Sequence, residues 1–212
     1  MKSVLIIGAG QFGIHIANRM SQLRCEIMAV DSEEERINTI LPFVTNAQIG
    51  DSTNADFMRS LGIPDFDVCI VTISDSFQDS LETTALLKDL GAQKVISRAQ
   101  NDVQEKFLLR NGADETVYPE KQTAIRLATK EASDDILDVF QLDRDLNIYE
   151  VRVPKAWNNK TLAELDIRKK HNLNVIAVRT KDQLILPMPD MVLSTDDAML
   201  LLGNIKDIQK AF

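Results

Sequence analysis

The segment VLIIGAGQFGIHIANRM, residues 4–20, places three glycines between an apolar run and an amphipathic pattern. Gly8, Gly10 and Gly13 have the GxGxxG spacing of a strand that turns into a phosphate-binding helix. The first glycine allows the tight turn, the second lets a phosphate approach, and the third packs the helix against the strand. Free amides at the start of the helix supply the anion site. The segment therefore predicts a nucleotide-binding turn.

An acidic residue follows this turn at the sequence spacing typical of a ribose-binding carboxylate. Asp31 ends the apolar run 26–31, 18 residues after Gly13. A carboxylate at this position can accept hydrogen bonds from both ribose hydroxyls, and it repels a 2′-phosphate. The strand, helix and acid together favour a site for adenosine nucleotides or NAD over a fold that has lost its ligand.

Two further strand ends add candidate contacts. Asp51 and Ser52 lie in the turn GDST, residues 50–53, which could touch the base or the ribose. Asp51 or Thr53 could instead cap the helix expected from Ala55, and both alternatives stay open. Thr72 ends the fourth expected strand, over the crevice where open α/β sheets bind ligands.

Apolar runs alternate with helical patterns through the first two thirds of the chain. The expected strands are 4–8, 26–31, 47–50, 67–73, 94–98 and 115–118, and the expected helices are 11–23, 33–41, 55–61, 77–90 and 103–111. Strands that are apolar throughout indicate a parallel sheet covered on both faces. The predicted fold is α/β, a Rossmann-like doubly wound parallel sheet.

The pattern changes after Tyr118. A long helix is expected over Pro119–Phe140, on a stripe of apolar residues at helical spacing. The polar stretch 141–147 is the expected boundary, which gives domains 1–140 and 141–212. The second domain is expected to be a small α+β module, with strands 149–153, 174–179, 184–187 and 198–203 and helices 161–169 and 206–212.

Composition limits the classes of function that the chain can have. The net charge of −8 disfavours nucleic-acid binding. Two cysteines and two histidines make a zinc site implausible. Neither a basic leader nor an apolar run of membrane-spanning length is seen, so a cytoplasmic protein is expected. His15 and His171 have no evident catalytic partner, which favours binding without chemistry; the alternative is an NAD(P)-dependent oxidoreductase.

Several motifs together resemble one family. They are GAGQFG with AVD at 29–31, GDST at 50–53, SRAQN at 97–101, FLLRNGADETVYPEK at 107–121 and ELDIRKKHNLNVIAV at 164–178. The chain resembles the KtrA/TrkA-type cytosolic regulators of bacterial potassium uptake, which have an RCK N-domain and a small RCK C-domain. The resemblance implies a homodimer that assembles into an octameric ring on a membrane potassium-translocating subunit. ATP or ADP, or NAD(H) in TrkA-like members, would change the shape of this ring.

The resemblance also implies site residues. The nucleotide contacts expected are Gly8, Gly10, Gln11, Phe12, Gly13, Asp31, Asp51, Ser52, Thr72 and Arg98. Glu120 matches a position that brings a divalent or monovalent cation to the phosphates, although a carboxylate there also suits a helix N-terminus. Gln11 departs from the arginine common in the family, so it puts the discrimination between ATP and ADP in doubt.

A second ligand is implied in the C-terminal module. Ile167, Arg168, Asn174, Ile176 and Pro189 occupy positions compatible with a pocket for cyclic di-AMP. An arginine suits a phosphate because its planar fork donates two hydrogen bonds at once. The alternative for Arg168 is a solvated basic helix end. The long helix over Pro119–Phe140 is the expected coupling element between ligand and ring.

Overall fold

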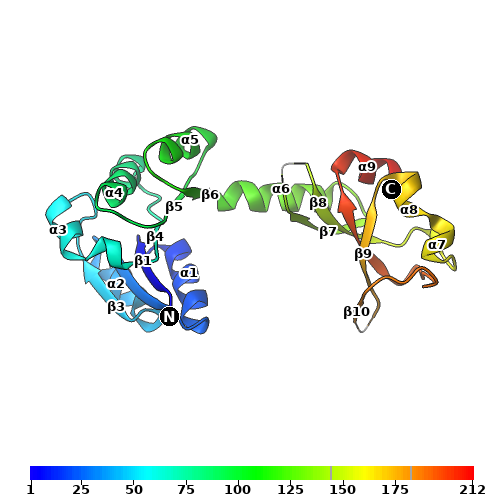
Figure 1. Ribbon diagram of the computed structural model, residues 1–212, viewed down its shortest axis with the longest axis horizontal. Helices are drawn as coiled ribbons and strands as arrows, with labels where there is room; N and C mark the ends of the chain where they lie inside the picture. The colour runs from blue at the N-terminus through cyan, green and yellow to red at the C-terminus, as the bar shows by residue number, and fades with distance from the viewer. Residues whose placement is uncertain (144, 182) are drawn as a thin grey trace. The chain divides into compact units, whose positions relative to one another are not determined.

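The computed structural model describes residues 1–143, 145–181 and 183–212. The chain forms two compact units, Met1–Glu120 and Lys121–Phe212, each with its own sheet (Figure 1). Within the described residues, no helix is both long and apolar enough to cross a lipid bilayer.

The first unit contains a six-stranded parallel sheet in the order β3-β2-β1-β4-β5-β6. Its strands are β1 Ser3–Ile7, β2 Glu26–Asp31, β3 Asn46–Ile49, β4 Val68–Val71, β5 Val95–Arg98 and β6 Glu115–Val117. The strand order reverses between β1 and β4, the position where doubly wound sheets bind ligands at the carboxyl ends of their strands. The predicted fold class is confirmed, and each predicted strand is found within a few residues of its expected bounds.

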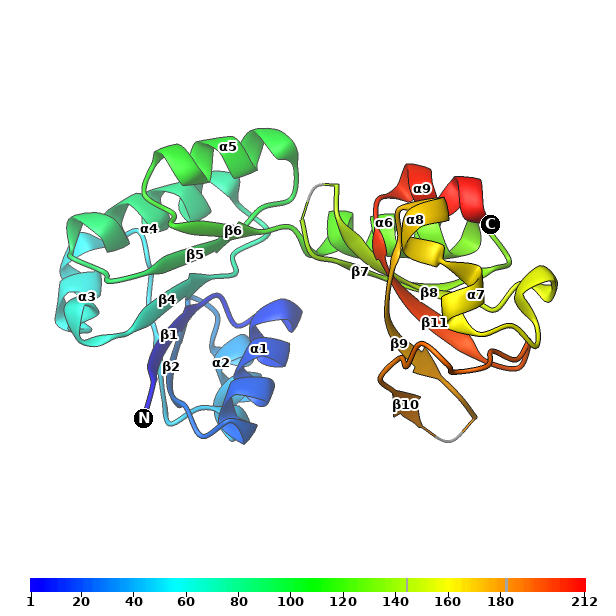
Figure 2. The ribbon, with the colours of Figure 1, turned by 45° about the vertical axis from the view of Figure 1, so that its right-hand side comes forward.

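Helices cover both faces of this sheet (Figure 2). Helices α1 (Gln11–Gln22) and α2 (Glu34–Ile40) pack on one face through the cluster that includes Ala17, Ile37 and Ile6. Helices α3 (Ala55–Ser60) and α4 (Phe77–Asp89) pack on the other through Met58, Leu87 and Leu5, and α5 (Asp102–Arg110) joins α4 in a smaller cluster. Short 3₁₀ helices lie at Leu41–Phe43 and Ile63–Asp65. Burial on both faces explains why the strands are apolar throughout.

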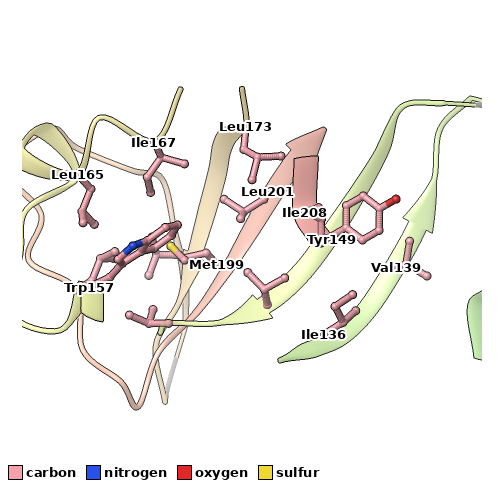
Figure 3. Close-up of a cluster of buried hydrophobic side chains, with 14 residues drawn as sticks. Ile136, Val139, Tyr149, Trp157, Leu165, Ile167, Leu173, Met199, Leu201 and Ile208 are labelled. Carbon is pink, nitrogen blue, oxygen red and sulfur yellow. The ribbon is translucent and has the colours of Figure 1, made fainter. Parts of the chain in front are cut away.

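The second unit contains a five-stranded antiparallel sheet in the order β10-β9-β11-β8-β7. The strands are β7 Ile136–Gln141, β8 Asn147–Arg152, β9 Asn174–Arg179, β10 Leu184–Ile185 and β11 Ala198–Gly203. Its helices are α7 Leu162–Leu165, α8 Ile167–His171 and α9 Ile205–Ala211, with a 3₁₀ turn at Lys155–Trp157. Figure 3 shows the core between sheet and helices, where Trp157, Met199 and Leu201 lie beside Leu165, Ile167 and Ile208.

The expected long helix over Pro119–Phe140 is wrong in its second half. Helix α6 spans Pro119–Glu131, and residues 136–141 form strand β7 instead. Ile136 and Phe140 are four residues apart, which suits a helix, but an apolar stretch of this length also suits a strand. Antiparallel pairing with β8, which places Phe140 opposite Ile148, decides the conformation.

Strand β7 also bears on where the boundary between the two units lies. The contacts divide the chain after Glu120, whereas the expected boundary at residues 140 and 141 falls inside β7. A cut there would separate β7 from the hairpin that it forms with β8. The expected helix 161–169 is likewise interrupted, because Asp166 takes a left-handed conformation with φ +45° between α7 and α8.

Two positions near the turn after β1 require glycine, one for its backbone conformation and one for close packing. Gly8 has φ +100°, which residues with a side chain rarely adopt. A Cβ on Gly13 would lie 2.2 Å from the carbonyl oxygen of Gly8, so α1 can approach β1 only with glycine there. Gly10 differs, because its Cβ would meet no atom within 4 Å.

This contrast predicts different stabilities for two alanine variants. Gly13→Ala should lower the free energy of unfolding by about 1–3 kcal/mol, because the added methyl forces α1 away from β1. Gly10→Ala should lower it by no more than about 1 kcal/mol, since the methyl enters open space at a helix N-cap. Urea denaturation of both variants measures the difference, and equal losses would contradict the packing of Gly13.

Candidate functional site

A cleft opens at the carboxyl ends of β1, β2, β3 and β4, at the point where the strand order reverses. Its lining includes six of the predicted nucleotide contacts: Gly8, Gly10, Asp31, Asp51, Ser52 and Thr72. The parallel pairing explains why they meet, because Ile7 of β1 is level with Val30 of β2 and Val71 of β4. Residues that follow these strands therefore gather at one edge.

Asp31 holds the glycine turn. Its side chain is buried, and its Oδ2 accepts a hydrogen bond of 2.7 Å from the amide of Ala9. Its Oδ1 accepts one of 2.9 Å from the amide of Glu33. An ionised carboxylate can accept about four hydrogen bonds. The two hydrogen bonds from Ala9 and Glu33 use two of these positions, which leaves two for other donors.

The start of α1 offers amide donors to an anion. Gly10 is the N-cap residue, no side chain caps this helix, and its first turn contains no acidic residue. The first amides of a helix have no partner inside the helix, and the helix dipole favours negative charge there. The open space above Gly10 leaves room for a phosphate. This end of α1 fits the phosphate group of a nucleotide.

Thr72 and Ser52 reach the cleft, but their hydroxyls also bind the protein. The Thr72 hydroxyl donates to the carbonyl oxygens of Gly8, at 2.5 Å, and of Ile7, at 3.1 Å. The Ser52 hydroxyl shares a hydrogen bond of 2.8 Å with the Thr83 hydroxyl on α4. Both side chains are buried. These hydrogen bonds hold the walls of the cleft in place, at the end of β4 through Thr72 and against α4 through Ser52.

Asp51 is not the cap of the following helix. Asn54 caps α3, since its side chain accepts hydrogen bonds from the amides of Asp56 and Phe57. Asp51 Oδ1 instead accepts hydrogen bonds from the hydroxyl and the amide of Thr53, which hold the pKa of Asp51 below its ordinary value. The capping alternative for Asp51 and Thr53 is therefore wrong, and the Asp51 carboxylate stays at the cleft.

An arginine that the sequence analysis missed lies in the cleft wall. Arg36 Nη2 is 2.9 Å from Asp75 Oδ2 and 3.0 Å from Glu33 Oε1, and Nη1 is 3.8 Å from Asp31 Oδ2. The hydrogen bond from Arg36 is the main cause of a lowered pKa at Asp75. Only the Glu33–Arg36 spacing was visible in the sequence, because Asp75 is 39 residues away along the chain.

The charged residues that line this cleft are mostly acidic. They are Asp31, Asp51, Asp75 and Asp79, against the single cation Arg36 among the described lining residues. The interior of the cleft therefore suits an uncharged base and ribose. A phosphate is better placed outside it, at the start of α1.

The other predicted contacts lie beside the cleft. Gln11 is exposed and lines a neighbouring groove with Gly10 and Arg36. The guanidinium of Arg98 lies over the ring of Phe12, 5.4 Å from its centroid, and forms an ion pair with Glu120. Among the described residues, no group of three or more His, Cys, Asp or Glu is placed to hold a metal ion. Within the described ranges, Glu120 is therefore not part of such a group.

A pocket in the second unit gathers four of the five residues predicted for a second ligand. Ile167, Arg168, Asn174 and Pro189 line it, together with Asp166 and Met188. Ile176 is not among its lining residues, although it lies on the same strand as Asn174. Ile167 also belongs to the hydrophobic core, which fixes the position of the neighbouring Arg168.

Comparisons with known proteins agree with this architecture. Residues 4–119 match the TrkA-N domain model, and residues 148–212 match the TrkA-C domain model. The chain is 35% identical over 210 residues to the Ktr system potassium uptake protein C of Bacillus subtilis, covering 99% of this chain and 95% of that protein. It is 30% identical to the Ktr system potassium uptake protein A of the same organism, with the same coverage.

A solved structure shares the fold over nearly the whole chain. The GsuK channel bound to NAD superposes with a TM-score of 0.70 at 18% identity, over 97% of this chain and 38% of the channel chain. The resemblance drawn from the motifs is confirmed by the two domain models and the Ktr relatives. The chain belongs to the Ktr and Trk family of potassium uptake regulators, with a TrkA-N domain followed by a TrkA-C domain.

Proposed function

We propose that this chain senses an adenine nucleotide in the cleft of its first unit and thereby regulates a membrane potassium-translocating subunit. One arrangement supports this above all. The buried Asp31 carboxylate keeps acceptor positions for a ribose beside the uncapped amides at the start of α1. A nucleotide needs both, an acceptor for its sugar and donors for its phosphate.

The charges orient the ligand. Its adenosine lies in the acidic cleft, with the ribose at Asp31, and its phosphates lie over Gly10 and the first turn of α1. Asp31 disfavours a 2′-phosphate by repulsion, so ADP, ATP and NAD(H) fit this site better than NADP. The fold is compatible with such a ligand, because the similar GsuK channel is described as bound to NAD.

Regulation fits the relatives better than catalysis. The Rossmann-like fold is shared with oxidoreductases, but the Ktr relatives that match nearly the whole chain are potassium uptake proteins. We infer a homodimer that assembles into an octameric ring on the cytoplasmic side of its partner. A nucleotide regulates such a ring only if it binds one of two ring shapes more tightly.

The pocket of the second unit is proposed to bind a second regulator. Arg168 offers a planar guanidinium at its rim, next to the apolar side chains of Ile167 and Pro189. A phosphate with a flat base, as in cyclic di-AMP, matches this combination.

Calorimetric titration of the whole chain with ADP, ATP, NAD and NADP tests the first site. We expect ADP, ATP and NAD to bind, and NADP to bind at least about tenfold more weakly than NAD, because Asp31 repels its 2′-phosphate. Gly10→Ala should weaken the binding of ADP while leaving the fold intact, since the added methyl occupies the space for the phosphate. Failure of every adenine nucleotide to bind would contradict the proposal, as would equal affinities for NAD and NADP.

Two substitutions separate the two tasks of Asp31. Asp31→Asn should lower the affinity for ADP by about tenfold or more, because the ribose loses a charged acceptor. Asp31→Ala should in addition lower the free energy of unfolding by about 2 kcal/mol, since the amides of Ala9 and Glu33 lose their acceptor. Titration and urea denaturation measure the two effects. Glu34→Gln, which removes one negative charge from an exposed residue of α2, is the control and should change neither the affinity for ADP nor the free energy of unfolding.

A further inference from the structure

Arg36 and Asp75 form an ion pair that crosses the edge of the sheet at the nucleotide cleft. Arg36 is the third residue of α2, which follows β2, and Asp75 lies in the loop after β4. Strands β2 and β4 flank β1 in the sheet. The 2.9 Å contact between Arg36 Nη2 and Asp75 Oδ2 therefore reaches across the end of β1, and both residues line the cleft.

The Arg36 guanidinium lies close to the carboxylate that is proposed to bind the ribose. Its Nη1 is 3.8 Å from Asp31 Oδ2. In Rossmann-like sites, an arginine beside the ribose is the group that accommodates a 2′-phosphate, so it permits NADP to bind. The partners that Arg36 has before a ligand arrives therefore bear on the choice between NAD and NADP.

Two carboxylates already engage this guanidinium. Its Nη2 is 2.9 Å from Asp75 Oδ2 and 3.0 Å from Glu33 Oε1, and the hydrogen bond to Asp75 is the main cause of a raised pKa at Arg36. Glu33 precedes Arg36 by three residues on the same segment, so Asp75 is the partner on the other side of the cleft. With Asp31, three carboxylates face one cation, and a 2′-phosphate there would meet a net negative charge.

The loop that carries Asp75 is held on both sides of this residue. The side chain of Gln100, which follows β5, donates a hydrogen bond to the carbonyl oxygen of Ser74. Ser76 caps α4 through its side chain. Asp75 is thus a positioned acceptor for the guanidinium before any ligand binds.

We propose that Asp75 is a specificity-determining residue of the nucleotide site, because it engages Arg36 and thereby withholds the guanidinium from a 2′-phosphate. The inference rests on the proposed function, which places the ribose at Asp31. Asp31 repels the 2′-phosphate directly, and Asp75 adds to this effect by occupying the cation that would attract it. Selectivity for NAD over NADP then depends on the ends of both β2 and β4.

Calorimetric titration of the whole chain with NAD and NADP, which differ only in the 2′-phosphate, tests the role of Asp75. In Asp75→Asn we expect NADP to bind at least about threefold more tightly than in the wild type, because Arg36 loses a charge-assisted partner. Asp75→Glu keeps the charge and should stay within about twofold of the wild-type ratio of the two affinities. Arg36→Gln should move the ratio further toward NAD, since the carboxylates are left without their cation.

Asp56→Asn is the matched control. Asp56 Oδ1 on α3 is 2.7 Å from Arg59 Nη1, and neither residue is among the described residues that line the cleft. The substitution removes the same charge and the same kind of ion pair as Asp75→Asn, and it should change neither affinity. Exposed ion pairs contribute little to stability, so these variants are expected to fold.

The outcomes distinguish this inference from the proposed function. An unchanged NADP affinity in Asp75→Asn would overturn it, as would a ratio that changes only because NAD binds more weakly. The same gain in a double variant with Arg36→Gln would also overturn it, because the lost negative charge alone would then explain the gain. If Asp75→Asn does not fold, Glu33→Gln frees Arg36 from its other partner and should also tighten NADP. Failure of the wild type to bind NAD, ADP or ATP would overturn the proposed function as well.

Discussion

The hydrogen bond between the Asp31 carboxylate and the Ala9 amide joins the end of β2 to the glycine turn. The Thr72 hydroxyl joins the same turn to β4 from the other side, through the carbonyl oxygen of Gly8. Gly13 then lets α1 pack directly on this turn, which aims the free amides of the helix at the edge of the sheet. A ligand site whose donors and acceptors are fixed before binding loses little entropy when the ligand arrives.

Charge divides this edge into two parts. The cleft between β2 and β4 is acidic and suits a neutral base and sugar. The start of α1, which has no side-chain cap and no acidic residue in its first turn, suits an anion. A ligand that spanned both parts would touch the strand ends and the first turn of α1.

Much of the first unit could be predicted from local patterns. The glycine spacing, the acid at Asp31 and the apolar strands each fix structure within a few residues, so their positions agree with the observed elements. The contact between Arg36 and Asp75 could not be predicted, because 39 residues separate them and only the fold brings them together. Arg98 and Glu120 were expected at the site from the resemblance alone, and their ion pair joins residues that are 22 positions apart along the chain.

The errors have physical causes of the same kind. Strand β7 was read as helix because its apolar residues fit both periods, and pairing with β8 decides between them. Capping of α3 by Asp51 or Thr53 was one of two open alternatives, and it is wrong because Asn54, the residue directly before the helix, binds its amides. Neighbouring polar residues compete for one cap, and local composition does not identify which of them binds the amides.

A crystal structure of the chain with ADP would show directly whether the nucleotide binds at Asp31 and the start of α1. In that structure we expect the ribose hydroxyls on the Asp31 carboxylate, the first phosphate on the amides at Gly10 and the start of α1, and the base between the ends of β2 and β4. ADP bound elsewhere on the chain, with Asp31 and the amides at Gly10 making no contact to it, would show that this cleft is not the nucleotide site.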